Sequence, residues 1–336
     1  MASTLIALKL GSTLTTIYRE GEGLVLREPS LIAVSGTIRS REIKAVGNNA
    51  KKLIGRTGDG QEVISPVSSG IIVDSELATE MLKRFLKQIE NHPKLFKSNI
   101  RAIVCVPLGI SLVERKTFEK VCYNAGINDV ILVPAIICSA YGEDIDVESP
   151  QGKLLVNIGG GATNIAVMAN NQIITGLSIA VGGTNITIAI TKLIEEKYNL
   201  KVSPLAAEEL KQNITSLYPD SKLAADITGI DKETKESKTI CISSNEIHLI
   251  VEHYYTKIVE AINTCLSNCP PDIIKDVVED GIYLFGSGAF VSGLEKFFKE
   301  KTGLPIKIGE HAKTDIYGAA KLINNPNALR DILLNV

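Results

Sequence analysis

The chain has 336 residues, of which 45% are hydrophobic and 22% charged, as in ordinary globular proteins, and this length predicts about two domains. Its 36 Lys and Arg residues are offset by 38 Asp and Glu residues, giving a net charge of −2. That balance excludes a general nucleic-acid binder, which needs surplus basic side chains to neutralise phosphates. No apolar stretch reaches the roughly 18 residues of a membrane-spanning helix, and the first residues lack the basic lead-in of a secretory signal. We therefore expect a cytoplasmic protein.

The first half of the chain predicts an opening hairpin followed by alternating helices and strands. Residues 5–18 (LIALKLGSTLTTIY) form two apolar strand patterns around a turn of small residues. The elements expected after it are a helix from Asp74 or Ser75, a strand at 103–106, a helix at 111–124, a strand at 130–133 and a helix at 136–142. The helix at 111–124 has the clearest ends, because Ser111 and Glu114 form a capping box and Gly126 stops it.

The second half opens with a similar hairpin. Residues 153–168 (KLLVNIGGGATNIAVM) repeat the order of strand, small-residue turn and strand, with residues 157–160 (NIGG) in the place of residues 9–12 (KLGS). The elements expected after it are a helix at 203–217, a charged hairpin tip at 231–238, a helix at 246–268 and a strand at 282–285. This repetition predicts a duplicated α/β domain, with halves at 1–145 and 146–336.

Both hairpin turns consist of small residues, which let backbone N–H groups approach a bound anion. Two such turns that face each other are expected to hold a phosphate chain from both sides. A third glycine-rich turn, residues 286–288 (GSG), follows the strand predicted at 282–285 and precedes a helix. One such turn is a weak sign of a nucleotide site, but a third turn in order after two phosphate-binding hairpins is a strong one.

These turns, in this order, resemble those of the superfamily of actin, heat-shock chaperones and sugar kinases, and the chain is similar almost end to end to the MreB-like bacterial actins. The stretches that resemble this family are EPSLIAV (28–34), AVGNNAKKLIGRT (45–57), GIIVDSE (70–76), VCVPLGISLVERK (104–116), NIGGGATNIAV (157–167) and PPDIIKDVVEDGIYL (270–284). The resemblance implies an α/β, actin-like ATPase fold, with duplicated ribonuclease-H-like domains flanking a nucleotide cleft. It also implies small insertions near 33–73 in the first domain and 184–245 in the second.

The resemblance implies that the cleft binds ATP or ADP. The implied phosphate contacts are Gly11, Ser12, Thr13, Leu14, Gly159, Gly160, Gly161 and Thr163, and the implied adenosine contacts are Glu208, Glu209, Leu210, Lys211, Gly286, Ser287, Gly288 and Ala289. Glu208 and Lys211 share one helix face, so they can reach ribose hydroxyls and the base. The alternative for this pair is a surface ion pair without a ligand.

Acidic residues that the family uses for hydrolysis are missing from the matching positions. Lys9 and Asn157 stand where the family has aspartates that hold Mg²⁺, and Ala135 stands where it has a glutamate that orients the attacking water. Lys9 can take the electrostatic place of the metal against a phosphate, whereas Mg²⁺ would be weakly held and no residue is assigned as its ligand. The resemblance therefore implies a pseudo-ATPase with no assigned catalytic residue.

A short loop predicts how the protein meets a membrane. Leu95 and Phe96 lie between Lys94 and Lys97. In MreB-like proteins an apolar pair in the corresponding loop dips into the inner leaflet, and flanking basic side chains meet anionic head groups. Without this family context, such a pair would more often be buried in the core.

The resemblance thus implies a cytoskeletal protein that forms filaments peripheral to the cytoplasmic membrane and organises cell shape and cell-wall synthesis. Its implied partners are further copies of itself or an active paralogue, inner-membrane lipid, and cell-wall synthesis or shape proteins, with no nucleic acid. Two alternatives stay open. One is an active ATPase or kinase of the same fold, and the other is a non-polymerising actin-like adaptor of a membrane machine.

Overall fold

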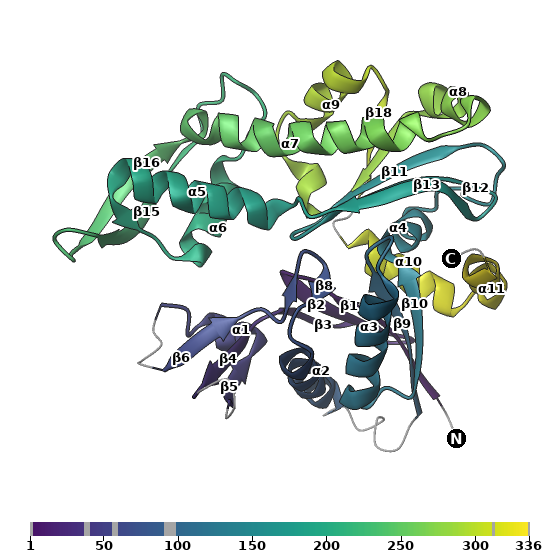
Figure 1. Cartoon of the computed structure of the whole chain (residues 1–336), viewed down its shortest axis with the longest axis horizontal. Helices are drawn as coiled ribbons and strands as arrows, with labels where there is room; N and C mark the ends of the chain where they lie inside the picture. The colour runs from purple at the N-terminus through teal and green to yellow at the C-terminus, as the bar shows by residue number, and fades with distance from the viewer. Residues whose placement is uncertain (1–2, 37–40, 56–59, 91–98, 311–312, 335–336) are drawn as a thin grey trace.

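The computed structural model describes residues 3–36, 41–55, 60–90, 99–310 and 313–334, which form two halves, each built on a five-stranded sheet (Figure 1). The first sheet contains β1 (Ser3–Leu10), β2 (Leu14–Arg19), β3 (Gly23–Pro29), β9 (Asn99–Val106) and β10 (Asp129–Pro134), in the order β10-β9-β1-β2-β3. The first three strands are antiparallel neighbours, whereas β9 runs parallel to β1, and β10 parallel to β9.

The second sheet repeats this arrangement. It contains β11 (Lys153–Ile158), β12 (Thr163–Ala169), β13 (Gln172–Ile179), β17 (Ile282–Phe285) and β18 (Ile306–Ile308), in the order β13-β12-β11-β17-β18. Again three consecutive strands are antiparallel neighbours, and the first of them pairs in parallel with a strand from later in the chain. The duplication predicted from the two hairpins is therefore confirmed.

Helices cover the outer face of each sheet. In the first half, α2 (Ser75–Glu90) and α3 (Leu112–Ala125) form one apolar core with Ile6 and Leu8 of β1. In the second half the covering helices are α7 (Ser244–Ser267), α8 (Pro271–Asp280) and α9 (Leu294–Thr302). The predicted ends of α3 are confirmed, since the Ser111–Glu114 capping box is formed and Gly126 closes the helix in the left-handed region.

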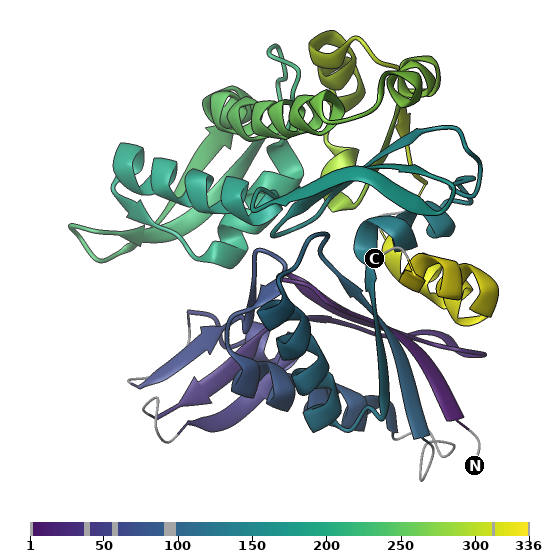
Figure 2. The same cartoon turned by 45° about the vertical axis from the view of Figure 1, so that its right-hand side comes forward.

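Two further helices, α4 (Ala135–Gly142) and α10 (Thr314–Ile323), lie between the two sheets (Figures 1 and 2). They form a third core with residues from the inner faces of both sheets, such as Ala7 of β1 and Leu155 of β11. Although α10 comes near the end of the chain, it contacts β1, β2 and β9 of the first half, and α11 (Pro326–Leu334) follows it. The backbones of the two helices approach each other closely because each helix has a glycine at the contact. A Cβ on Gly318 of α10 would lie 1.6 Å from the carbonyl oxygen of Cys138, and one on Gly142 of α4 would lie 2.0 Å from the carbonyl oxygen of Thr314.

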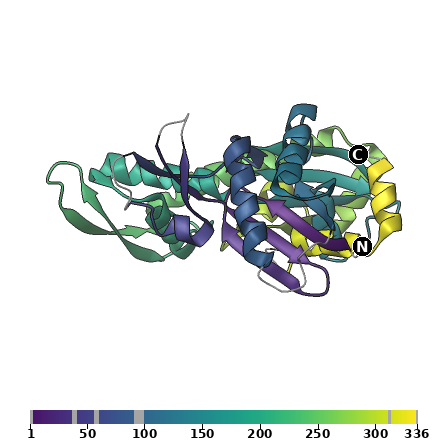
Figure 3. The ribbon, with the colours of Figure 1, turned by 90° about the horizontal axis from the view of Figure 1, so that it is seen from below.

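A small subdomain is inserted into each half, and both extend toward the same side of the molecule (Figure 3). The first contains β4 (Ile32–Ser35), β5 (Glu42–Val46), α1 (Gly47–Lys51) and β6 (Gln61–Ile64), followed by β7 (Val67–Ser68) and β8 (Ile71–Ile72). The second contains α5 (Gly183–Tyr198), β14 (Leu200–Lys201), α6 (Pro204–Ile214), β15 (Ala224–Asp231) and β16 (Ser237–Ser243). These elements lie close to the ranges 33–73 and 184–245 expected for the insertions.

The helix predicted at 203–217 ends three residues earlier than expected. Ser203 caps α6 as predicted by accepting a hydrogen bond from the N–H of Ala206 at 3.1 Å. After Ile214 the chain turns into an extended conformation, and the N–H of Leu217 donates to the carbonyl of Ser292 at 2.8 Å. A contact with a distant segment therefore replaces the last helical turn, and the helical pattern alone does not show it.

Glu246, in the first turn of α7, joins this helix to α5. Its carboxylate accepts hydrogen bonds from the side chains of Lys197 and Tyr198 and from the N–H of Ser243. Burial on its own raises the pKa of Glu246, but these hydrogen bonds outweigh it and lower the pKa from the ordinary 4.5 to about 2.

We expect the stabilising effect of Glu246 to be complete above about pH 4.5 and to be lost as the pH falls toward about 2, because the unfolded chain binds the proton first. Glu246→Gln should therefore lower stability near neutral pH and flatten the stability profile across this acidic range. Urea unfolding at a series of pH values measures both effects. Glu295→Gln, at an exposed first-turn glutamate of α9, is the matched control for removing a carboxylate from the first turn of a helix, and should lower stability near neutral pH by less than Glu246→Gln. Identical profiles for Glu246→Gln and the parent would contradict this account.

Candidate functional site

Two adjoining cavities lie between the halves, where the turns of the β1–β2 and β11–β12 hairpins face each other. The larger cavity has a volume of about 140 Å³ and is lined by Lys9, Gly11, Ser12, Thr13, Leu14, Thr16, Arg27, Asn157, Gly159, Gly160, Glu208, Gly286, Ser287, Lys313, Asp315 and Ile316. The smaller cavity, of about 60 Å³, is lined by Lys9, Leu10, Gly11, Ser12, Gly70, Cys105, Val106, Pro107, Ala135, Asn157, Gly159, Gly160, Gly161, Ala162 and Asn164.

The two hairpin turns have the same backbone geometry. The N–H of Gly11 donates to the carbonyl of Leu14 at 3.1 Å, and the N–H of Gly159 donates to the carbonyl of Ala162 at 2.9 Å. A Cβ on Gly11 would lie 2.8 Å from the oxygen of Leu14, and one on Gly159 would lie 2.9 Å from the oxygen of Ala162. Each turn therefore needs glycine at its first position, which explains the repeated sequence pattern.

The turns also touch each other across the boundary between the halves. A Cβ on Gly160 would lie 2.1 Å from Oγ1 of Thr13, and one on Gly161 would lie 2.4 Å from Oγ of Ser12. Ser12 is fixed in turn, because its Oγ accepts a hydrogen bond from the N–H of Gly70 at 2.8 Å. The missing side chains thus allow the two backbones to approach closely enough to enclose one small anionic group.

Most of the sequence-predicted residues meet at these cavities, and six of them do not line them. Those that line a cavity are Gly11, Ser12, Thr13, Leu14, Gly159, Gly160, Gly161, Glu208, Gly286 and Ser287. Those that do not are Thr163, Glu209, Leu210, Lys211, Gly288 and Ala289. Thr163 is buried and donates its hydroxyl to the carbonyl of Val181 at 2.7 Å. Leu210 and Ala289 belong to the apolar core of the second half.

Glu208 belongs to α6 and lines the larger cavity. Its carboxylate accepts hydrogen bonds from Lys211 at 2.7 Å, from Gln212 at 3.0 Å and from the hydroxyl of Thr187. Lys211 also donates to the carbonyl of Gly183 at 3.0 Å. Lys211 therefore orients the Glu208 carboxylate, and of the two side chains only Glu208 lines the cavity.

Lys9 forms an ion pair with Asp315, which the first residues of α10 place beside the end of β1. The Asp315 side chain is only 5% exposed, and that of Lys9 is 31% exposed toward the cavities. Burial lowers the pKa of Lys9, but the charge of Asp315 and its hydrogen bond outweigh burial and raise it. Lys9 is therefore an ammonium group, and Asp315 offsets part of the positive charge expected from the lost acids.

The smaller cavity has a neutral lining apart from Lys9. Asn157 donates to the hydroxyl of Ser139 at 2.7 Å, and the side-chain oxygen of Asn164 accepts the N–H of Leu108 at 2.8 Å. The neighbouring Cys138 thiol and burial raise the pKa of Cys105 well above its ordinary value, so this thiol is not ionised. Among the described residues that line the smaller cavity, none is a carboxylate or an imidazole.

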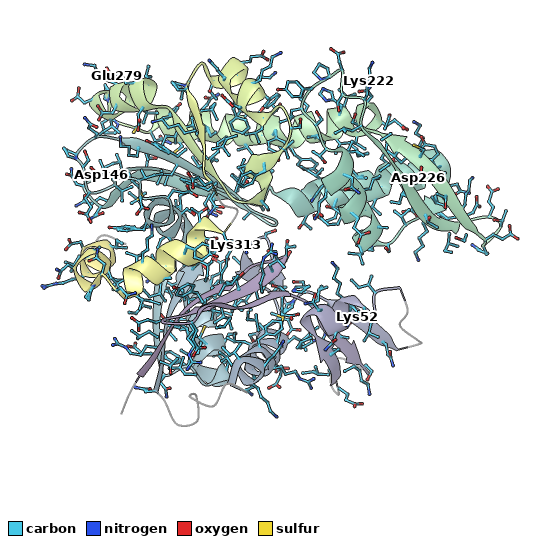
Figure 4. The ribbon with its side chains drawn as sticks, turned by 180° about the vertical axis from the view of Figure 1, so that it is seen from behind. Lys52, Asp146, Lys222, Asp226, Glu279 and Lys313 are labelled. Carbon is cyan, nitrogen blue, oxygen red and sulfur yellow. The ribbon has the colours of Figure 1, made fainter. Side chains whose placement is uncertain are left out.

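Sequence reasoning missed three charged residues of the larger cavity: Arg27, Lys313 and Asp315. Arg27 lies in β3, and Figure 4 shows Lys313 between the two halves, just before α10. None belongs to a glycine-rich turn or to a spaced motif. No local pattern in the sequence marks them, and only the packing of α10 against β1 brings Asp315 to the site.

Known proteins that are similar to this chain include MreB and Mbl proteins. The family model of the MreB/Mbl protein matches residues 3–331. The cell shape-determining protein MreB of Escherichia coli (strain K12) is 32% identical over 319 residues, covering 94% of this chain and 91% of that protein. The cell shape-determining protein Mbl of Bacillus subtilis (strain 168) is 30% identical over 326 residues, covering 96% and 97%.

Solved structures that are similar to this chain also include an MreB protein. MreB5 of Spiroplasma citri bound to ADP has a TM-score of 0.88 at 28% identity and covers 98% of both chains, and the same protein bound to AMPPNP has a TM-score of 0.87 at 30% identity, covering 97% and 98%. The MamK double helical filament has a TM-score of 0.78 at 18% identity, covering 96% and 99%. The fold is therefore that of the actin-like ATPases, and the expected fold class is confirmed. Within this class, the chain belongs to the MreB/Mbl family.

The fold family implies Mg²⁺ beside the phosphates, and Mg²⁺ prefers carboxylate and other oxygen ligands. The cavity residues do not fit this ion. Asp315 is ion-paired with Lys9, and the amides of Asn157 and Asn164 already make hydrogen bonds. Across the described parts of the chain, no group of three or more His, Cys, Asp or Glu side chains could hold a metal ion. The Lys9 ammonium also repels a dication.

The predicted membrane-contacting pair, Leu95 and Phe96, lies outside the described residues. No helix in the described ranges combines the length and apolarity needed to cross a membrane.

Proposed function

We propose that this chain is a filament-forming cell-shape protein that binds adenine nucleotide between its halves and hydrolyses ATP weakly or not at all. The shape role is supported by its MreB and Mbl relatives, whose names describe them as cell shape-determining. Nucleotide binding is supported by the two facing turns and by the similar MreB5 structures bound to ADP and AMPPNP. MamK, which shares the fold, forms a double helical filament.

The cleft geometry favours one orientation of the nucleotide. The phosphates lie between the turns at Gly11 and Gly159, where small residues let backbone N–H groups approach them. The adenosine extends toward Glu208 on one side and toward Gly286 and Ser287 on the other. This orientation uses the ten predicted residues that line the cavities and gives the other six no contact with the nucleotide.

The lining of the smaller cavity is the observation that supports weak hydrolysis. A group that orients or deprotonates the attacking water contributes about 10²–10⁴-fold to such a reaction. Here Ala135 offers a methyl group, Asn157 and Asn164 are hydrogen-bonded amides, and Cys105 is a neutral thiol. None of these side chains can take a proton from water at neutral pH.

We expect phosphate release from ATP in magnesium buffer to be about 10²-fold or more below that of a fold member with its acids in place. A phosphate-release assay measures this, and sedimentation should recover similar amounts of polymer with ADP and with AMPPNP, because hydrolysis does not time assembly. Turnover that disappears in Asn157→Ala, or in Lys9→Met combined with Asp315→Asn, would show a catalytic cleft and overturn the first part. A protein that stays monomeric with and without nucleotide would overturn the second part and favour the adaptor alternative.

The remaining elements of this function stay predictions from the family. They are association with the inner leaflet through Leu95 and Phe96, a cytoplasmic location peripheral to that membrane, copolymerisation with an active paralogue, and contact with cell-wall synthesis or shape proteins.

A further inference from the structure

Lys9 lies where the two cavities meet. It is the second-last residue of β1 and lines both cavities, together with Gly11, Gly159 and Asn157. Its Cε is 3.6 Å from the position that a Cβ on Gly11 would take, so the side chain runs along the first hairpin turn. The ammonium group is thereby held beside the backbone that is expected to meet the phosphates.

Basic side chains also outnumber acidic ones around the larger cavity. Glu208 is neutralised by Lys211, and Asp315 by Lys9. Arg27 and Lys313 line the same cavity and have no ion-pair partner among the described residues. The cavity therefore has an excess of positive charge before any ligand enters, and this charge comes from side chains on β3 and just before α10.

We infer that the cleft binds adenine nucleotide without a divalent cation, because Lys9, assisted by Arg27 and Lys313, supplies the positive charge that faces the phosphates. This inference rests on the proposed nucleotide binding and specifies the ionic form of the ligand. The magnesium complex is the poorer ligand for two reasons. The dication would approach the Lys9 ammonium, and it would cancel phosphate charge that the three basic side chains attract.

Asp315 positions Lys9 for this role. Its carboxylate is buried, and the N–H of Ile316 donates to its second oxygen at 2.8 Å, so it is a fixed anchor for the ammonium group. Removing Lys9 alone would leave this carboxylate buried without a counter-charge, which is strongly destabilising. A variant that tests binding must therefore neutralise both residues, as in Lys9→Met combined with Asp315→Asn.

Isothermal titration of the full-length protein with ADP, in buffer with EDTA and in buffer with MgCl2, tests the inference. We expect binding in EDTA that is as tight as in MgCl2 or tighter. Binding that MgCl2 strengthens by about tenfold or more would overturn metal independence and leave the proposed nucleotide binding intact. Absence of ADP binding in both buffers would instead overturn the proposed function itself.

Two variants and one control sharpen this test. The Lys9→Met, Asp315→Asn double variant should lose about tenfold or more of the affinity in EDTA, and unchanged affinity would overturn the role of Lys9. Lys9→Asp combined with Asp315→Asn places one carboxylate where the ammonium group stood, so MgCl2 should now strengthen ADP binding and raise the melting temperature of this variant alone. Lys153→Met is the matched control, because Lys153 pairs with Asp280 at 2.8 Å on β11, away from both cavities, and its binding should equal that of the parent in both buffers.

Discussion

Replacing Gly161 by alanine is expected to lower the affinity for ADP by about a hundredfold while the chain still folds. The new Cβ would lie 2.4 Å from Oγ of Ser12, 2.7 Å from Cβ of Ser12 and 3.1 Å from the backbone nitrogen of Ser69. Two of these atoms cannot rotate away, so the second hairpin must move back from the first. A displacement of about 1 Å in a positioned site can reduce its function by about 10²-fold. Titration with ADP measures the loss, and circular dichroism checks the fold.

Two further variants separate the steric clash between the two turns from a general effect of adding a methyl group. Gly21→Ala, in the β2–β3 turn, has nothing within 4 Å of the new Cβ and should bind ADP as the parent does. Gly161→Ala combined with Ser12→Gly removes the obstructing side chain and should recover part of the affinity. Parent-like affinity in Gly161→Ala alone would show that the two turns do not form the phosphate site.

Gly318→Ala is expected to lower the free energy of unfolding by about 3 kcal/mol or more. Its Cβ would lie 1.6 Å from the oxygen of Cys138, 2.6 Å from the carbonyl carbon of Cys138 and 2.7 Å from the nitrogen of Gly142. All three are backbone atoms of α4, so the obstruction can be relieved only by moving one helix away from the other. Asp315 lies one turn earlier on α10, so the same movement would separate it from Lys9. Urea unfolding measures the change.

Gly303→Ala is the matched control for this substitution. Gly303 has a φ of 72° and open space around the new Cβ. Alanine there should therefore lower the free energy of unfolding only by the strain of a left-handed backbone, about 1–2 kcal/mol. Equal losses in the two variants would mean that helix crossing adds nothing beyond conformational strain, and would contradict the role assigned to the α4–α10 contact.

Much of the fold could be predicted because it depends on local signals. The two hairpins are marked by small residues between apolar strands, and α3 is marked by Ser111, Glu114 and Gly126, each of which acts within one turn of the helix. The hairpin turns, which line the cavities as a pair, are marked in the sequence for the same reason. Their glycines are required by contacts inside the turn itself, as at Gly11 and Gly159.

The remaining site residues depend on contacts that no local pattern shows. Asp315 is 306 positions from Lys9 in the chain, and the two meet only because α10 packs between the sheets. Some residues next to a motif do not line the cavities, for a different reason. Thr163 begins β12 and is buried, although Ala162 and Asn164 beside it line the smaller cavity. Leu210 lies on the buried side of α6, although Glu208 two residues earlier lines the larger cavity. Side-chain direction alternates within an element, and a motif does not record it.

The position of α10 between the sheets also affects the order in which the protein can fold. The strands of the first sheet precede residue 135, but residues 314–323, which cover the inner face of β1 and β9, follow the whole second sheet in the chain. The N-terminal half therefore cannot complete its core until the second half has been synthesised, although domains usually fold one after the other from the N-terminus. Over that interval apolar residues such as Ala7, Ile103 and Cys105 stay uncovered by α10, and exposed apolar surface of this kind favours aggregation of the nascent protein.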